Sequence, residues 1–157
     1  MYGHWFDWSN VASCLAHAKI SPTKNVDGHV ESISGYVLRR CFLEGIELAH
    51  LLVDTVIDKK GEDILLLDIR EQTVFCDYFL FCNAENERQL KALAEGLIEK
   101  AKKEAGWLSR GMEGAVESGW VLLDFGDLIV HIFNPEQRAY YNLEDLWHEA
   151  RVVVRVA

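Results

Sequence analysis

Residues 119–133, GWVLLDFGDLIVHIF, decide the fold, because two apolar runs flank a short polar stretch. Each run has the length of a strand, and the residues between them, DFGD at 124–127, are typical of a turn. The pattern predicts a β-hairpin. Two registers are open. A two-residue loop pairs Trp120 with His131, whereas a three-residue loop with Gly126 in the left-handed region shifts every pair by one.

Two more apolar runs of strand length lie upstream of the hairpin. They are EDILLLDIR at 62–70 and VFCDYFLFC at 74–82, and both suit strands covered on two faces. Apolar residues at helical spacing predict a helix over 44–60. A second, longer helix is capped by Asn83 or Asn86 and stops at Gly106. The strand–helix–strand order predicts at least one parallel pair of strands.

The C-terminal part of the chain adds shorter elements. Residues 107–118 predict a poorly defined strand and a loop. Asn134-Pro135 starts a short helix, with asparagine as the cap and proline at the first helical position. We therefore expect an α/β (α+β) fold, in which helices pack on a single mixed β-sheet of about five strands.

The charge of the chain is unevenly distributed. The 157 residues carry a formal net charge of −9, which argues against a broad grip on nucleic-acid phosphates and permits a basic protein partner. Residues 1–42 hold four Lys/Arg against three Asp/Glu, so the acidity belongs to residues 43–157. No run approaches about 20 apolar residues and no secretory signal is visible, so we expect a cytoplasmic protein without membrane contact.

The patterning of the sequence divides the chain into three segments. Residues 1–42 lack a sustained helix or strand period, so we expect an atypical N-terminal extension that is either disordered or translated from an upstream start. A genuine appendage with its own role is the alternative. Regular patterning defines the domain at 43–150, and residues 151–157 are expected to be a C-terminal tail.

The sequence contains few candidates for chemistry. Asp63, Asp68 and Asp77 lie near strand ends, so a nucleotidyltransferase-like enzyme that holds a divalent metal between them is the alternative function. No phosphate-binding glycine loop or nucleophile elbow accompanies them. We expect His131 to be structural, and the four cysteines, Cys14, Cys41, Cys76 and Cys82, lack zinc spacing. The prediction is a protein without catalytic residues, metal or cofactor.

The hairpin is therefore the best candidate for a binding surface. Trp120, Leu122 and Asp124 share one face of the strand, and tryptophan is a preferred interface anchor. An exposed Trp120 rimmed by Asp124 and Asp127 suits a partner that offers apolar area together with Lys or Arg. A wholly buried Trp120 is equally open. An apolar hairpin face would also support a homodimer.

Residues 43–150 contain a series of short motifs. They are Gly61-Glu62-Asp63-Ile64 with Leu67-Asp68, Asp77-Tyr78-Phe79, Arg88-Gln89, Glu113-Gly114, the segment from Trp120 to His131, Pro135-Glu136, Arg138, Tyr141 to Glu144, and Leu146-Trp147. In this order they resemble the motifs of the ribosomal silencing factor family, also called Iojap-like proteins. Asn83-Ala84 stands where the family usually has Thr-Gly. Each motif is weak alone, and their shared order makes the set specific.

The resemblance implies a fold related to nucleotidyltransferases but without their catalytic residues. It also implies binding to the fourteenth protein of the large ribosomal subunit, a small basic β-barrel on the face that meets the small subunit. A domain bound there blocks subunit joining and represses translation, notably under nutrient limitation, and organellar relatives act in large-subunit assembly. The partner contacts that the resemblance implies are Trp120, Asp124, Phe125, Asp127, Asp77 and Tyr78.

Overall fold

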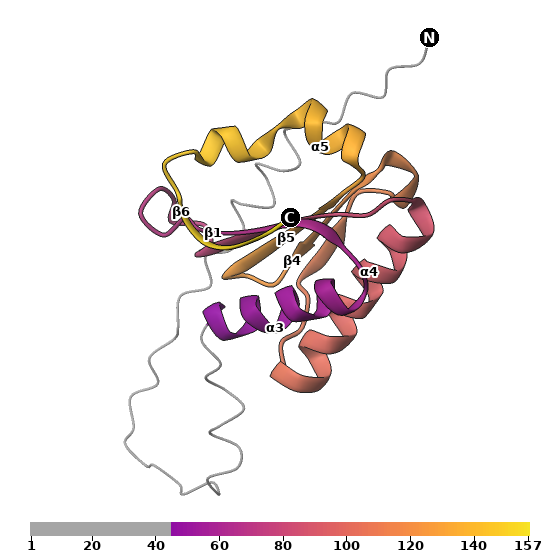
Figure 1. Cartoon of the computed structure of the whole chain (residues 1–157). Helices are drawn as coiled ribbons and strands as arrows, with labels where there is room; N and C mark the ends of the chain where they lie inside the picture. Colours follow the sequence, from indigo (N-terminus) through magenta and orange to yellow (C-terminus); the bar gives the residue numbers. More distant parts are fainter. Residues whose placement is uncertain (1–44) are drawn as a thin grey trace, which may run out of the picture. The chain divides into compact units, whose positions relative to one another are not determined.

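The strands form one mixed six-stranded sheet in the order β3-β4-β5-β2-β1-β6. A computed structural model describes residues 45–157 (Figure 1). β2 and β5 run parallel, and the other neighbouring pairs run antiparallel. The predicted mixed sheet is confirmed, with one strand more than expected. The strands are β1 (Glu62–Asp68), β2 (Tyr78–Asn83), β3 (Gly111–Glu113), β4 (Trp120–Asp124), β5 (Leu128–Phe133) and β6 (Arg151–Val156).

The additional strand, β6, lies at the edge of the sheet beside β1. A C-terminal tail is expected over 151–157 from the sequence, whereas the structure has a six-residue strand there. β-branched residues suit a pleated surface, and Val154 and Val156 pair with Leu66 and Ile64 of β1. The run RVVVRV does not alternate between apolar and polar residues, and its pairing partner, β1, lies far away in the sequence.

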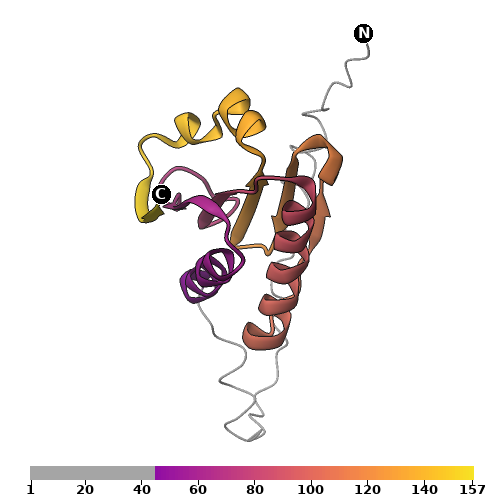
Figure 2. The same ribbon diagram turned by 45° about the vertical axis from the view of Figure 1, so that its right-hand side comes forward.

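Two helices cover one face of the sheet, α3 (Gly45–Asp58) and α4 (Glu87–Lys100) (Figures 1 and 2). Asn86 caps α4, because its side-chain oxygen accepts a hydrogen bond from the backbone N–H of Gln89 at 2.9 Å. The helix continues as a π-helical turn, η1 (Ala101–Ala105), and stops at Gly106, which has φ +70°. Both predicted helices are confirmed. No helix within residues 45–157 has the length and apolarity to cross a membrane.

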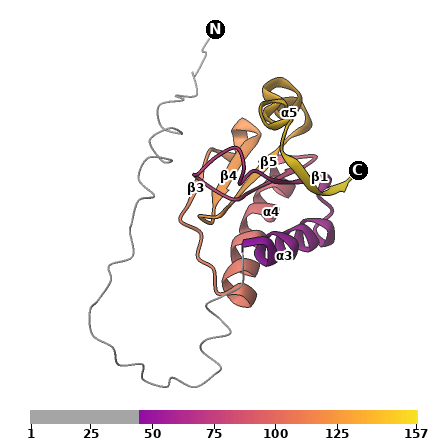
Figure 3. The same ribbon diagram turned by 90° about the vertical axis from the view of Figure 1, so that its left-hand side faces the viewer.

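The other face is covered by α5 (Pro135–Tyr141) and the 3₁₀ helix η3 (Leu143–Trp147). Figure 3 shows α5 on the side of the sheet opposite to α3 and α4, so the described chain has three layers. Asn134 caps α5 through the backbone N–H of Gln137, with Pro135 at the start of the helix. This helix start is as predicted from the sequence.

The hairpin forms as predicted, but neither of the two predicted registers is correct. Trp120 pairs with Phe133, and Leu122 pairs with His131. The turn residues are Gly126 and Asp127, because the backbone N–H of Phe125 donates to the carbonyl oxygen of Leu128 at 2.9 Å. Gly126 has φ +89°, a conformation that bulky residues avoid. Placing glycine at the first turn position keeps Phe125 out of that conformation and moves the pairing.

The strand predicted over 74–82 begins only at Tyr78. Residues 69–77 form a loop instead, which we call the β1–β2 loop. Its base is closed by a hydrogen bond from the backbone N–H of Ile69 to the carbonyl oxygen of Asp77, at 2.9 Å. Because β1 ends at Asp68, Val74 and Phe75 have no strand to pair with, and their β propensity has no effect here.

Candidate partner-binding surface

The β4–β5 turn and the start of β2 meet at one end of the sheet. We call this region the acidic end and define it by Asp77, Asp124 and Asp127. The backbone N–H groups of Asp77 and Tyr78 both donate to the carbonyl oxygen of Asp127, at 2.8 and 3.0 Å. The parallel pairing of β2 with β5 starts directly after this contact. Parallel pairing therefore brings together carboxylates that lie far apart in the sequence.

The described residues offset only part of the negative charge of the acidic end, since Arg70 acts on Asp77 without forming a salt bridge with it. Burial, followed by the charge of Asp127, raises the pKa of Asp77 above its usual value. The side chain of Asp124 accepts a hydrogen bond from the backbone N–H of Gly126 at 2.6 Å. Within residues 45–157, none of the three carboxylates forms a salt bridge. A cationic group brought by a partner would relieve this repulsion.

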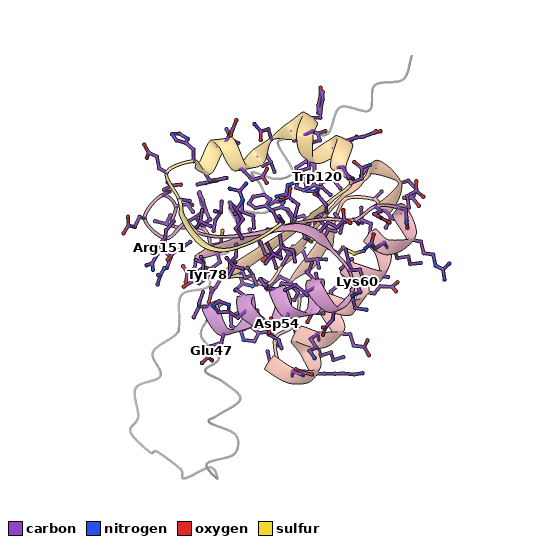
Figure 4. All side chains as sticks on the ribbon, viewed as in Figure 1. Glu47, Asp54, Lys60, Tyr78, Trp120 and Arg151 are labelled. Atoms are coloured by element: carbon purple, nitrogen blue, oxygen red, sulfur yellow. The ribbon has the colours of Figure 1, made fainter. Side chains whose placement is uncertain are left out.

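Trp120 lies in an aromatic cluster beneath α5, and only 8% of its surface is exposed. Its ring packs on Phe133 and Tyr141, with centroids 5.0 and 4.9 Å away. Its indole N–H donates to Nδ1 of His131 at 3.4 Å. Figure 4 shows Trp120 between the sheet and α5. Of the two alternatives that the sequence left open, the structure has the buried Trp120, because α5 and its neighbours cover this face.

The other two aromatic residues of the implied contact set are also buried, on the opposite face of the sheet. Phe125 is 1% exposed and belongs to the core shared with α3 and α4. Tyr78 belongs to the same core, and the guanidinium of Arg70 lies over its ring at 5.4 Å from the centroid. Figure 4 shows Tyr78 at the end of the sheet where α3 begins. The structure thus brings the carboxylates of the contact set to one end and places its aromatic rings inside.

His131 is a structural residue, as the sequence predicts. Its imidazole stacks on Phe81 at 5.0 Å between centroids and contacts Phe79 edge-on at 5.3 Å. Burial lowers its pKa to about 3, so the ring is neutral at physiological pH. A neutral imidazole with Nδ1 unprotonated accepts the Trp120 hydrogen bond, which fixes the orientation of both rings.

The strand-end carboxylates do not converge on a shared metal position. Asp63 and Asp68 stand at opposite ends of β1, with Cα atoms roughly 15 Å apart from the rise per residue. Asp68 is held by Arg70 through two side-chain hydrogen bonds of 2.9 and 2.6 Å. Among residues 45–157, no three His, Cys, Asp or Glu side chains are grouped to hold a metal ion. The observation that would favour a nucleotidyltransferase is therefore missing from this part of the chain.

Two of the four cysteines lie within the described residues. Cys76 and Cys82 are buried and free. Burial raises the pKa of each thiol to about 12, and the carboxylates of the acidic end add to the shift at Cys76. Thiolates at these positions are therefore scarce at neutral pH. Cys14 and Cys41 lie outside the described residues.

Arg138 is the residue whose role the sequence did not reveal. It is buried on α5 and donates to the carbonyl oxygen of Asp63, to the side-chain oxygen of Asn83 and to the carboxylate of Glu144, at 2.5 to 3.0 Å. These bonds join α5 to β1, β2 and η3. A cavity of about 460 Å³ adjoins this network, but no buried side-chain polar atom within residues 45–157 is left without a partner. The network therefore positions α5 over the aromatic cluster.

Comparison with known proteins identifies relatives for most of the chain. The family model described as "Ribosomal silencing factor during starvation" matches residues 43–156. A ribosomal silencing factor from Halalkalibacterium halodurans is 41% identical over 107 residues, which cover 68% of this chain and 91% of the relative. The chloroplastic protein Iojap of Arabidopsis thaliana is 32% identical over 130 residues, covering 83% of this chain and 48% of Iojap. A match of that length cannot fit within residues 43–157, so it includes part of the first 42 residues.

Solved structures agree with the sequence comparison. A crystal structure of a protein from Chromobacterium violaceum superposes with a TM-score of 0.65 at 38% identity, covering 68% of this chain and 88% of the other. A Bacillus halodurans crystal structure gives a TM-score of 0.58 at 41% identity, covering 66% of this chain and 95% of the other. The family match spans nearly all of the described residues and is independent of the fold described above. This chain belongs to the ribosomal silencing factor family.

Proposed function

We propose that this chain is a non-enzymatic translational repressor that binds the large ribosomal subunit through a basic protein. The partner that the family resemblance implies is the fourteenth protein of that subunit. Bound there, the chain prevents the small subunit from joining because it occupies the joining face. The protein acts in the cytoplasm and uses no cofactor. The acidic end carries this proposal, since Asp77, Asp124 and Asp127 form no salt bridge within the described chain.

Charge and size both support repression by occlusion. An acidic surface raises the association rate with a basic partner and makes binding weaken as salt increases. A folded domain of about the described length has a radius of gyration of about 13 Å. A rigid body of that size on the joining face leaves no room for direct contact between the subunits. Repression by volume requires no chemical step.

Within the implied contact set, we assign different roles to the carboxylates and to the aromatic rings. Asp77, Asp124 and Asp127 are the contacts, because their carboxylates lie at the same accessible end of the sheet. Phe125 and Tyr78 lie in the core next to this surface, whereas Trp120 lies at the other end of β4, where it pairs with Phe133. Phe125 holds the turn through its hydrogen bond to Leu128, and Tyr78 begins the β2–β5 pairing.

A subunit-joining assay tests the proposal directly. Purified large and small subunits are mixed with increasing amounts of the full chain and separated on a sucrose gradient. We expect the joined ribosome peak to fall and the chain to sediment with large subunits. The double variant Asp77→Asn/Asp127→Asn should repress much less. The control Asp54→Asn removes an exposed carboxylate in the middle of α3, away from the acidic end (Figure 4), and should repress like the parent.

Two outcomes would contradict the proposal. Normal subunit joining at saturating concentrations of the chain would exclude repression by occlusion. Equal repression by the double variant and by the parent would instead remove the acidic end as the contact. Repeating the binding step at higher salt adds a further check, because a contact made by these carboxylates must weaken.

A further inference from the structure

The β1–β2 loop holds its conformation through backbone hydrogen bonds. The N–H groups of Gln72 and Thr73 both donate to the carbonyl oxygen of Ile69, at 2.9 and 3.1 Å. The N–H of Ile69 in turn donates to the carbonyl oxygen of Asp77. Arg70 is tied to Asp68 by two side-chain hydrogen bonds. The loop therefore has a closed base that fixes where its apex lies.

The apex of this loop presents two apolar side chains to solvent. Val74 is 96% exposed and Phe75 is 56% exposed, whereas Cys76, the next residue, is buried. The N–H of Phe75 donates to the side-chain oxygen of Thr73 at 3.2 Å, so the backbone is held here too. A preformed aromatic group loses little conformational entropy when a partner covers it, and such residues carry much of the binding energy of interfaces.

The apex adjoins the acidic end. Phe75 is two residues from Asp77. The thiol of Cys76, between them, lies close enough to Asp77, Asp124 and Asp127 that their charges add to the rise in its pKa. The loop adds Glu71, which is exposed. Three cations lie nearby: Arg70, whose guanidinium is bonded to Asp68; Arg151, which pairs with Asp68 across β1 and β6; and Arg110, which lies against the turn glycine. They are outnumbered by Asp68, Glu71 and the three carboxylates of the acidic end. The surroundings of the apex therefore remain negative overall.

We propose that Val74 and Phe75 are the apolar anchor of the partner-binding surface and enter a hydrophobic recess on a basic protein whose Lys or Arg side chains meet Asp77 and Asp127. This inference rests on the proposed function and adds the element that the buried Trp120 does not supply. Interfaces of this kind combine a central apolar contact with charged groups at the rim, so the anchor controls affinity and the carboxylates control the association rate.

The test compares two exposed apolar residues at opposite ends of the domain. Phe75→Ser removes the anchor. The control, Ile57→Ser, changes a residue that is 43% exposed near the C-terminal end of α3, whereas the first residue of α3, Gly45, packs beside Tyr78 at the acidic end. Binding of the full chain to purified large subunits is measured by co-sedimentation over a concentration series, and urea unfolding checks that both variants are folded. We expect Phe75→Ser to bind at least about tenfold more weakly than the parent, and Ile57→Ser to bind like the parent.

A photo-crosslinker at position 75 identifies the partner. With benzoylphenylalanine in place of Phe75, irradiation of the complex should give an adduct with a basic large-subunit protein. Parent-like affinity of Phe75→Ser, or an adduct with ribosomal RNA only, would overturn this inference while the proposed function stands. If the parent chain itself does not bind large subunits, the proposed function and this inference both fail.

Discussion

The buried imidazole of His131 should make the stability of the fold depend on pH. Phe81 and Phe133 stack on the ring, and no charged group within the described residues contributes to its pKa shift, which burial alone causes. The pKa is about 3 in the folded chain, and a histidine in an unfolded chain titrates near 6.5. At a pH between these two values, the His131 side chain binds a proton in the unfolded chain but not in the folded chain.

The size of the effect follows from this difference. Each pKa unit corresponds to about 1.4 kcal/mol, so protonation of the unfolded chain removes about 4 to 5 kcal/mol by the time the pH has fallen to 3. Because folding lowers the pKa of His131, protonation favours the unfolded chain. The stabilisation is complete above pH 6.5, is lost progressively as the pH falls, and reaches its full loss near the folded pKa of about 3. A loss of this size is a large part of the stability of a typical domain.

Urea unfolding of the parent and of His131→Gln between pH 7 and 4.5 measures this contribution. Glutamine is neutral throughout and offers an oxygen to the indole N–H of Trp120. Below pH 6 we expect the free energy of unfolding of the parent to fall with decreasing pH more steeply than that of the variant, by about 1.4 kcal/mol per pH unit. Carboxylates such as Asp77 titrate in both proteins, so their effects cancel in the comparison. Parallel curves for the two proteins would refute the reasoning.

Three further predictions concern the fold. Arg138→Met should lower the free energy of unfolding by about 3 kcal/mol in urea titrations. It leaves the Glu144 carboxylate, the Asp63 carbonyl oxygen and the Asn83 side-chain oxygen without their donor. A loss below about 1 kcal/mol would contradict the positioning role. Gly114→Ala should cost at least about 2 kcal/mol, since the residue has φ +90° and an added Cβ would collide with the carbonyl oxygen of Trp120; an unchanged melting temperature would exclude this clash. Burial raises the pKa of Cys76 and Cys82 to about 12, so both thiols should resist a thiol-reactive label at pH 8 until urea unfolds the chain. Peptide mass spectrometry locates the labelled cysteines. Rapid labelling of the folded protein would show that burial does not protect them.

The features that the sequence predicts correctly depend on residues that are close together in the chain. Asn86 and Asn134 begin helices because their side chains reach backbone N–H groups three residues away. Gly106 ends a helix because it adopts the left-handed conformation at the last turn. The two strands of the hairpin can be predicted from the length and the apolar composition of each run. These local signals are sufficient for the helices, the hairpin and the class of fold.

The candidate surface was only partly predictable. The sequence indicates an acidic hairpin with a tryptophan and suggests a basic partner. In the structure, Asp124 and Asp127 of the hairpin lie together with Asp77 at one end of the sheet. It does not indicate that α5 buries Trp120, nor that Val74 and Phe75 lie in a loop at the same end. The burial of Trp120 stayed open and the strand predicted over Val74 and Phe75 was wrong for the same reason. Strand propensity and interface preference describe a residue type, whereas pairing and exposure depend on which element lies beside the residue.

By itself, the sequence determines an acidic domain with an α/β pattern and with motifs in the order of the ribosomal silencing factor family. Tertiary structure decides the hairpin register, the sixth strand and the meeting of Asp77 with Asp127. The physical reason is the same in each case. Strand pairing joins residues that are distant in the chain, and its register depends on the burial of whole faces and on the conformation of a single turn residue, Gly126, rather than on the residues of either strand alone.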